Sequence, residues 1–424
     1  MAQLPVSSEC HLHRTAARVS KNDSRLKSNP AIILSTRLAI VLSHPVQYYS
    51  PWFRWIATHT KLQLKVFYLC DPGANGSHDS KFGRIISWDV DLLSGYEHEY
   101  VPNCARHPDT TRFFGLYNPE LASRLRAWKP SAILLFGYAY RSHLGLILRP
   151  PAPLIFRGDS HLIRQPKPSL LKRILLKYVY GQFASITYVG KANREYFRTF
   201  QIPESKLHFA PHCVNAEHFQ STDERQQDAL ALRDQLGLIG KRVVLFAGKF
   251  VPQKQPLELL KAFISVATSK DALVLVGDGV EKPELKKLAA AHPQISVHFL
   301  PFANQSEMPI RYLMADIFVL ASRGNYETWG LAVNEAMHLG VPCLVSDRVG
   351  CQQDLVTDGE TGWVVDSEHP DSIADKLSIA LSTLDNKTAL AAMSTAIAKR
   401  ITQYTYTQAT EGLQAAITRV LKHP

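Results

Sequence analysis

Residues 315–347 of the chain have the sequence ADIFVLASRGNYETWGLAVNEAMHLGVPCLVSD. The apolar run Asp316–Ala321 predicts a buried strand, a polar loop follows it, and Gly330 opens an apolar helix that ends at Gly340. The run Val341–Ser346 predicts the next strand. Strand, helix and strand in this order are typical of a parallel α/β sheet. The helix amino terminus then lies beside a strand end, where its free N–H groups and its dipole favour a phosphate.

The same alternation of short apolar runs and helical patterns extends over most of the chain. In the first half the predicted strands are Arg37–Ser43, Leu62–Leu69, Ser131–Phe136, Pro153–Arg157 and Ala184–Val189, and the predicted helices are Tyr49–Thr58, Pro119–Trp128, Ser169–Tyr180 and Lys191–Phe200. In the second half the predicted strands also include Arg242–Ala247, Ala272–Val276 and Ser296–Leu300. We therefore expect an α/β protein with two doubly wound, Rossmann-like domains and a ligand site in the cleft between them.

The domain boundaries follow from where the alternation stops and restarts. Residues 1–36 form a leader that we expect to be disordered, and residues 37–210 form the first domain. Residues 211–240 are interpreted as a linker and residues 241–402 as the second domain. The last segment, 403–424, is a predicted helix that either caps the second domain or crosses back to the first.

Composition narrows the class of protein. With 46% hydrophobic and 20% charged residues among 424, the chain is ordinary for a globular protein, and it has no apolar run long enough for a membrane-spanning helix. The net charge of +11 is uneven: residues 1–210 contain 28 Lys and Arg against 13 Asp and Glu, whereas residues 211–424 contain 20 against 24. The basic first half predicts an anionic surface or polyanion as a partner.

Two carboxylates stand out near the decisive stretch, Glu327 in the loop and Glu335 in the helix. If they bracket a ligand, one accepts hydrogen bonds from ribose hydroxyls and the other from a second sugar. The alternative is that Glu327 helps to cap the helix and Glu335 is solvated. Spacing alone favours neither interpretation.

Two lysines follow another predicted strand end. Lys249 and Lys254 stand in the segment VVLFAGKFVPQKQP, residues 243–256, at the carboxyl end of the same sheet. Two cations there would neutralise a diphosphate, and the helix beginning after Gly330 would complement them.

Together these segments resemble glycosyltransferase family 4, whose members have the GT-B fold of two facing Rossmann-like domains and use nucleotide sugars. The resemblance is strongest over residues 240–366 and is carried by Gly248, Lys249, Lys254, the LVGDG segment 275–279, and the segment from Glu327 through Glu335 to Pro342. It implies a retaining enzyme in which Lys254 and Lys249 bind the donor diphosphate, assisted by N–H groups near Gly330 and Leu331. It also implies that Glu335 holds the ribose and Glu327 the donor sugar.

The chain departs from the family pattern at two positions. Lys249 replaces the more common arginine, so a bidentate phosphate contact becomes a point charge. Gln255 replaces the more common glycine, which leaves the local backbone shape open.

The first domain offers further candidates at strand ends. The segment SHPVQYYSP, residues 43–51, resembles that of a subgroup of the family and implies that His44 and Gln47 face the donor sugar or the acceptor. Asp159 and His161 follow the predicted strand Pro153–Arg157 and are candidates for contacts to the reacting sugar, with His161 grouped with Glu327 and Lys254 as catalytic.

Two further segments carry weaker patterns, residues 89–91 and 169–180. Asp89-Val90-Asp91 matches a metal-binding D-x-D motif, but no neighbouring residues support a metal site. We therefore expect neither a bound metal ion nor a cofactor. The segment Ser169–Tyr180 mixes lysines and an arginine with leucines and aromatics; it is either an ordinary helix packed on the sheet or a helix that lies on an anionic membrane.

The sequence therefore predicts a transferase that moves a hexosyl group from a nucleoside diphosphate sugar to a hydroxyl of a glycan or lipid-linked acceptor. Its alternatives are an epimerase or phosphorylase of the same fold, and a non-enzymatic membrane or nucleic-acid adaptor. We expect no nucleic-acid partner, and we expect a cytoplasmic protein that is either free or peripheral at the inner face of the membrane. The six cysteines include no C-x-x-C pair, which favours reduced thiols in a cytoplasmic protein.

Overall fold

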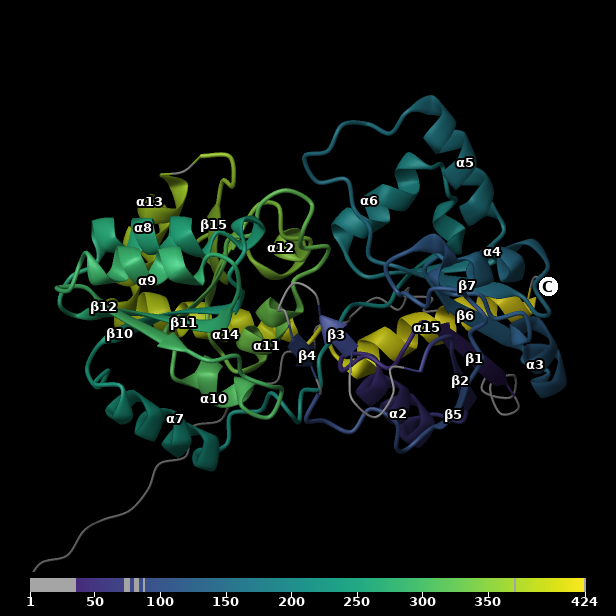
Figure 1. The fold of residues 1–424 in the computed structure, drawn as a ribbon, viewed down its shortest axis with the longest axis horizontal. Helices are drawn as coiled ribbons and strands as arrows, with labels where there is room; N and C mark the ends of the chain where they lie inside the picture. The colour runs from purple at the N-terminus through teal and green to yellow at the C-terminus, as the bar shows by residue number, and fades with distance from the viewer. Residues whose placement is uncertain (1–35, 72–76, 80–83, 87, 370, 423–424) are drawn as a thin grey trace, which may run out of the picture.

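The computed structural model describes residues 36–71, 77–79, 84–86, 88–369 and 371–422. The predicted leader, residues 1–36, lies outside them apart from Thr36. Two α/β domains face each other, the second on the left of Figure 1 and the first on the right. A short antiparallel pair of strands, β3 (Ser77–Asp79) and β4 (Arg84–Ile86), accompanies the two large sheets.

The first domain is built on a parallel sheet of seven strands. In sheet order they are β5 (Glu97–Tyr100), β2 (Gln63–Tyr68), β1 (Arg37–Leu42), β6 (Ala132–Phe136), β7 (Leu154–Arg157), β8 (Ser185–Tyr188) and β9 (Leu207–Phe209). The interior strand β1 is apolar on both faces because both are buried: Leu38 and Ile40 belong to one hydrophobic cluster, and Ala39 and Val41 to another. Helices connect the strands: α2 (Ser50–His59), α3 (Leu121–Trp128), α4 (Arg141–Leu148), α5 (Leu170–Gly181) and α6 (Lys191–Thr199).

The second domain contains a parallel sheet of six strands and one large core. In sheet order they are β12 (Ser296–Leu300), β11 (Asp271–Asp278), β10 (Arg242–Lys249), β13 (Ile317–Leu320), β14 (Cys343–Ser346) and β15 (Gly362–Val365). Its helices are α8 (Pro256–Val266), α9 (Lys282–Ala290), α10 (Met308–Leu313), α11 (Leu331–His338), α12 (Gln352–Leu355), α13 (Ser372–Leu384) and α14 (Lys387–Ile401).

The segment interpreted as a linker contains a helix. Residues Asp223–Gln235 form α7, whose Thr222 caps it by accepting a hydrogen bond from the Arg225 N–H. The helix packs on the second domain through Ala229, and Arg233 pairs with Asp316 at 2.8 Å. Only Ala229 of its side chains is buried, so the sequence shows no apolar stripe by which to recognise it.

The last helix crosses back to the first domain. After α14, helix α15 (Tyr406–Lys422) runs beneath the first sheet, as the yellow ribbon in Figure 1 shows. Its Ala409, Leu413 and Ile417 join the same hydrophobic cluster as Leu38 and Ile40. The chain therefore passes between the domains twice, before α7 and after α14.

Direct contacts hold the domains together along one side. Arg164 of the first domain pairs with Asp347 at 2.6 Å and with Asp366 at 2.8 Å. At a second point the backbone N–H of Lys191 donates to the Asp354 carboxylate at 2.9 Å. None of the helices in the described part of the chain is long and apolar enough to cross a bilayer.

Candidate functional site

A cavity of about 420 Å³ lies between the domains, where the carboxyl ends of strands from both sheets meet. From the second domain it is lined by Gly248, Lys249, Lys254, Gly277, Gln305, Tyr312, Glu327, Gly330, Leu331 and Glu335, among others. From the first domain it is lined by Tyr48, Tyr49, Trp88, Asp159 and His212. The structure thus brings both predicted lysines, both predicted glutamates, the start of the predicted helix and Asp159 to one place.

Lys254 is positioned by the strand end beneath it. Strand β10 ends in Gly248 and Lys249, and a short 3₁₀ turn, Pro252–Lys254, returns the chain toward the strand. A methyl group on Gly248 would come within 3.3 Å of Lys254 Cδ, so the lysine side chain lies across the backbone of the strand end. Its Nζ is 3.1 Å from Glu327 Oε2, an ion pair that joins two of the predicted residues.

Gln255 adopts the backbone shape that glycine would favour. Its φ of 55° and ψ of 39° lie in the left-handed region, which disfavours side chains. The side chain is buried, and its amide donates to the Ala321 carbonyl at 2.6 Å. This hydrogen bond ties the turn Pro252–Lys254 to the residue after β13. Glutamine therefore holds the turn in the left-handed shape that glycine would adopt at this position.

The loop after β13 delivers Glu327 and then the amino terminus of α11. Gly330 caps the helix with φ of 99°, and a methyl group there would lie 2.8 Å from Val349 Cγ1, so both conformation and space require glycine. The first N–H groups of an α-helix have no intrahelical acceptor. Leu331 and Ala332, which carry them, line the cavity beside Lys254. Positive charge from the side chains and from the helix therefore converges on one volume.

Glu335 is buried at the inner wall of the cavity. Its Oε2 accepts a hydrogen bond from the Tyr312 hydroxyl at 2.7 Å, whereas its Oε1 has no hydrogen-bond partner among the described residues. Burial raises the pKa of this carboxyl from 4.5 to about 7. The alternative of a solvated Glu335 is therefore wrong. A buried carboxylate that faces a cavity and has one oxygen without a partner can accept a hydrogen bond from a hydroxyl group of a ligand.

This burial predicts a pH dependence of stability. Since the folded-state pKa lies above the unfolded value, the stabilisation is complete below about pH 4.5 and is lost as the pH rises through about 7. Wild type should lose roughly 3 kcal/mol relative to Glu335→Gln between pH 4.5 and pH 8. Thermal unfolding of both proteins across this range checks it; parallel curves would show that Glu335 does not carry the raised pKa.

Asp159 reaches across the cleft from the first domain. It follows β7, and its Oδ2 accepts a hydrogen bond from the Thr328 hydroxyl at 2.7 Å. His212 Nε2 is 3.6 Å from the same oxygen and has no hydrogen-bond partner among the described residues. Burial acts to raise the pKa of Asp159, but His212 and Thr328 outweigh it and lower this pKa to about 2. Asp159 is therefore an anion at neutral pH, and it faces the cavity opposite the lysines.

Three predicted residues do not line this cavity. His161 Nδ1 accepts from the Ile163 N–H, and its Nε2 lies 3.4 Å from the Glu327 carbonyl oxygen, so it contacts the loop that carries Glu327. His44 Nδ1 lies 3.0 Å from Ser43 Oγ. Gln47 lines a smaller neighbouring cavity of about 210 Å³, together with Gln305.

Sequence reasoning missed several residues that do line the cavity. Tyr48 lies within the 43–51 segment beside Gln47, and His212 follows strand β9, which is only three residues long. Gln305 and Tyr312 lie in and after a loop with no motif. The sequence signal for His212 is its position after a strand end, but a strand of three residues is too short to be recognised from the sequence alone.

The D-x-D carboxylates have separate partners. Asp89 accepts a hydrogen bond from the Ser306 N–H at 3.3 Å, whereas Asp91 accepts from Leu93 and Ser94 and pairs with Arg54 at 3.3 Å. Within the described ranges no three His, Cys, Asp or Glu side chains are grouped so that they could hold a metal ion.

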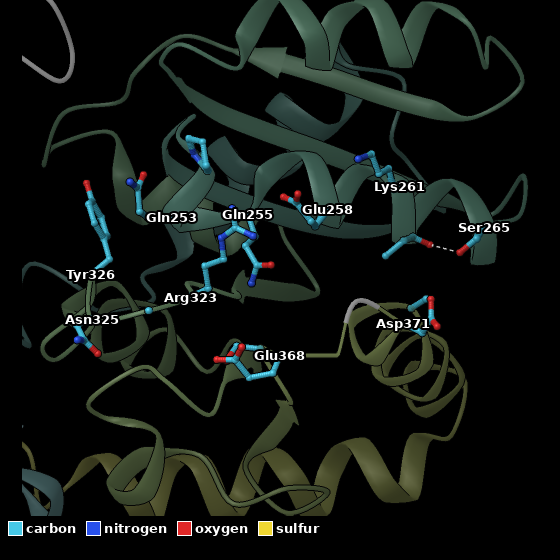
Figure 2. Close-up of a pocket in the computed structure, with 15 residues that line it drawn as sticks. Gln253, Gln255, Glu258, Lys261, Ser265, Arg323, Asn325, Tyr326, Glu368 and Asp371 are labelled. Atoms are coloured by element: carbon cyan, nitrogen blue, oxygen red, sulfur yellow. Dashed lines mark hydrogen bonds between the residues drawn. The ribbon is translucent and has the colours of Figure 1, made fainter. Parts of the chain in front are cut away.

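A larger cavity of about 1070 Å³ lies within the second domain, on the other side of the turn Pro252–Lys254. Figure 2 shows Glu258, Lys261 and Ser265 of α8 along one side of it, with Glu368 and Asp371 opposite. It shares Tyr326 with the interdomain cavity but holds none of the predicted site residues. Size alone therefore does not identify the site; the interdomain cavity is distinguished by the strand ends of both domains and the start of α11, which meet there.

Residues 230–398 match the family model described as Glycosyl transferases group 1. Spore coat protein SA of Bacillus subtilis is 29% identical over 180 residues, which are 40% of this chain and 47% of that protein. The GDP-mannose-dependent alpha-(1-6)-phosphatidylinositol monomannoside mannosyltransferase of Mycobacterium tuberculosis is 29% identical over 219 residues, 49% of this chain and 55% of that protein. The chain thus spans about half the length of the curated relatives it matches.

Solved structures match over nearly the whole fold. A glycosyltransferase from Rickettsia africae superposes with a TM-score of 0.69 at 14% identity, covering 92% of this chain and 99% of that one. HepE from Anabaena, solved in complex with UDP and glucose, gives a TM-score of 0.65 at 17% identity, covering 89% and 98%. The fold class predicted from the sequence is confirmed. The chain has the GT-B fold of two facing Rossmann-like domains, and the part that matches the family model Glycosyl transferases group 1 is residues 230–398, most of the second domain.

Proposed function

We propose that the protein is a glycosyltransferase that moves a hexosyl group from a nucleoside diphosphate sugar to a hydroxyl of a glycan or lipid-linked acceptor, with retention of configuration, at the cytoplasmic face of a membrane. The observation that carries the proposal is the convergence of Lys249, Lys254 and the start of α11 on a cavity that also holds Glu327 and Glu335. The names of the relatives support the reaction class.

The diphosphate is the leaving group, and its charge grows as the glycosidic bond breaks. Lys249, Lys254 and the N–H groups at the start of α11 are fixed before the reaction, so they stabilise that charge without reorganisation. In our proposal these groups, rather than a metal ion, neutralise the diphosphate. Glu335 accepts hydrogen bonds from the ribose through its unpaired oxygen, and Glu327 holds the donor sugar.

Retention follows if both bond changes occur on one face of the sugar. The bond between the anomeric carbon and the diphosphate oxygen breaks, the acceptor oxygen bonds to the same carbon, and the acceptor proton passes to the departing phosphate. Protein groups then need only position the two substrates. Asp159, an anion on the first-domain side, is placed to accept a hydrogen bond from a sugar hydroxyl.

Asp159→Asn should lower transfer by about 10²-fold while the affinity for the nucleoside diphosphate is unchanged, because in our proposal this carboxylate contacts a sugar hydroxyl and the lysines bind the diphosphate. Thr328→Val is the matched control: it removes the hydrogen bond across the cleft and keeps the carboxylate. Steady-state kinetics and nucleotide titration separate the effects. Equal losses in both variants would assign the Asp159 effect to domain packing.

The test of the function is a donor panel. UDP-, GDP- and dTDP-sugars are screened for protection against thermal unfolding, because a ligand that binds the folded form raises the melting temperature. The stabilising donor is then incubated with and without candidate glycan and lipid acceptors. Acceptor-dependent release of nucleoside diphosphate is expected. Release with an altered free sugar and no acceptor would instead identify an epimerase, and no stabilisation by any donor would contradict the proposal.

A further inference from the structure

Helix α5 exposes an unusual amount of apolar surface for a helix on a globular domain. Its Leu170, Leu171, Ile174, Leu175 and Tyr178 are 57–77% exposed, and only Leu176 and Tyr180 are buried. In Figure 1 the helix stands at the outer edge of the first domain. The sequence pattern left open whether this helix packs on the sheet or lies on a membrane, and the structure shows that most of its apolar side chains do not pack on the sheet.

The exposed side chains form a stripe. At about 100° per residue, Leu171, Ile174, Leu175 and Tyr178 fall within one sector of the helix, opposite the buried Leu176 and Tyr180. Lys172 and Lys177 fall on the two sides of this sector. An apolar stripe bordered by lysines on both sides is typical of a helix that lies in a membrane interface.

The charged residues in the sequence around α5 are all basic. Residues 160–194 contain seven Lys and Arg and no Asp or Glu. Lys167 and Arg173 line a surface cavity of about 420 Å³ at the start of α5, with Gln165 and Gln201. Arg173 also lines an adjoining cavity with Ile174 and Lys177. Cationic side chains and amides in these hollows provide donors for phosphate groups next to the apolar stripe.

We propose that α5 docks the protein on an anionic phospholipid bilayer, with the Leu171, Ile174, Leu175 and Tyr178 stripe at the boundary between headgroups and acyl chains. The exposed Lys167, Lys172 and Lys177 contact the lipid phosphates. Charge complementarity favours the bilayer over a second copy of the same helix, because stripes facing one another would bring their bordering lysines together. Docking does not depend on the proposed transfer, although it would bring the cleft to a lipid-linked acceptor.

Flotation of the full chain with vesicles tests the docking. Phosphatidylcholine vesicles with and without phosphatidylglycerol are compared for wild type, Leu171→Ser/Ile174→Ser and Lys172→Gln/Lys177→Gln. Wild type should bind the anionic vesicles, and each double variant should bind at least about tenfold more weakly. All replaced side chains are exposed, so the melting temperatures should stay close to wild type.

Two control variants replace exposed side chains in the second half of the chain, away from α5. Leu230→Ser on α7 and Lys286→Gln on α9 should leave vesicle binding unchanged. Absent binding of wild type, or equal binding to neutral and anionic vesicles, overturns the proposal. Self-association that disappears in Leu171→Ser/Ile174→Ser, without vesicle binding, assigns the surface to a second copy and also overturns it. The donor panel needs no vesicles, so failure of docking leaves the proposed transfer separately testable.

Discussion

Lys254→Met should lower the rate of transfer by about 10²–10³-fold and weaken binding of the nucleoside diphosphate, with little change in the fold. The Lys254 ammonium lies beside Gly248 and 3.1 Å from Glu327, and Lys254 lines the same cavity as the first residues of α11. Its removal withdraws the charge from the leaving group and leaves Glu327 without its ion-pair partner. Initial rates and calorimetric titration with the diphosphate measure the two losses.

Glu327→Gln separates the roles of the paired residues. If Glu327 holds the donor sugar, this variant should lose transfer to a similar extent but bind the diphosphate at least as well as wild type, because Lys254 is no longer shared with a carboxylate. Lys261→Met, on α8 in the larger cavity, is the matched control and should be fully active. Full activity of Lys254→Met would remove the central assignment of the site.

Gly412→Ala should destabilise the first domain by about 3 kcal/mol. Helix α15 packs so closely on β9 that a methyl group on Gly412 would lie 1.8 Å from the Phe209 carbonyl oxygen, a backbone atom that cannot turn away. The helix would have to lift, disturbing the buried hydrogen bond from Trp52 Nε1 to Thr410 Oγ1 at 3.0 Å. A lower melting temperature and faster proteolysis are expected.

Gly145→Ala provides the control for this substitution. Gly145 is also helical, in α4, and a methyl group there would meet no atom within 4 Å. Alanine should therefore be neutral or slightly stabilising at this position. A Gly412→Ala protein as stable as wild type would show that α15 sits less tightly on β9 than described.

The sequence predicts the second domain and its part of the site well for a physical reason. Strands β10 and β13 are buried on both faces, so they appear as continuous apolar runs. Lys249 ends β10, and Lys254 and Glu327 lie in the loops that follow the two strands. Parallel neighbours in one sheet bring such loops to the same edge without further information.

The parts that escaped prediction depend on contacts between distant segments. Strand β9 is three residues long and becomes a strand only by pairing with β8, and α7 has a single buried side chain. The neighbours of Asp159, namely His212 and Thr328, come from the two different domains. No local pattern encodes how the domains face each other, so those contacts required the structure.

The return of α15 to the first domain has a consequence for how the protein is made. Leu38 and Ile40, near the start of the described chain, share a core with Leu413 and Ile417. On the ribosome, the first domain cannot complete this core until the whole second domain has been synthesised. We therefore expect the second domain to mature first and the first domain to remain open to chaperones and proteases until translation has passed residue 417.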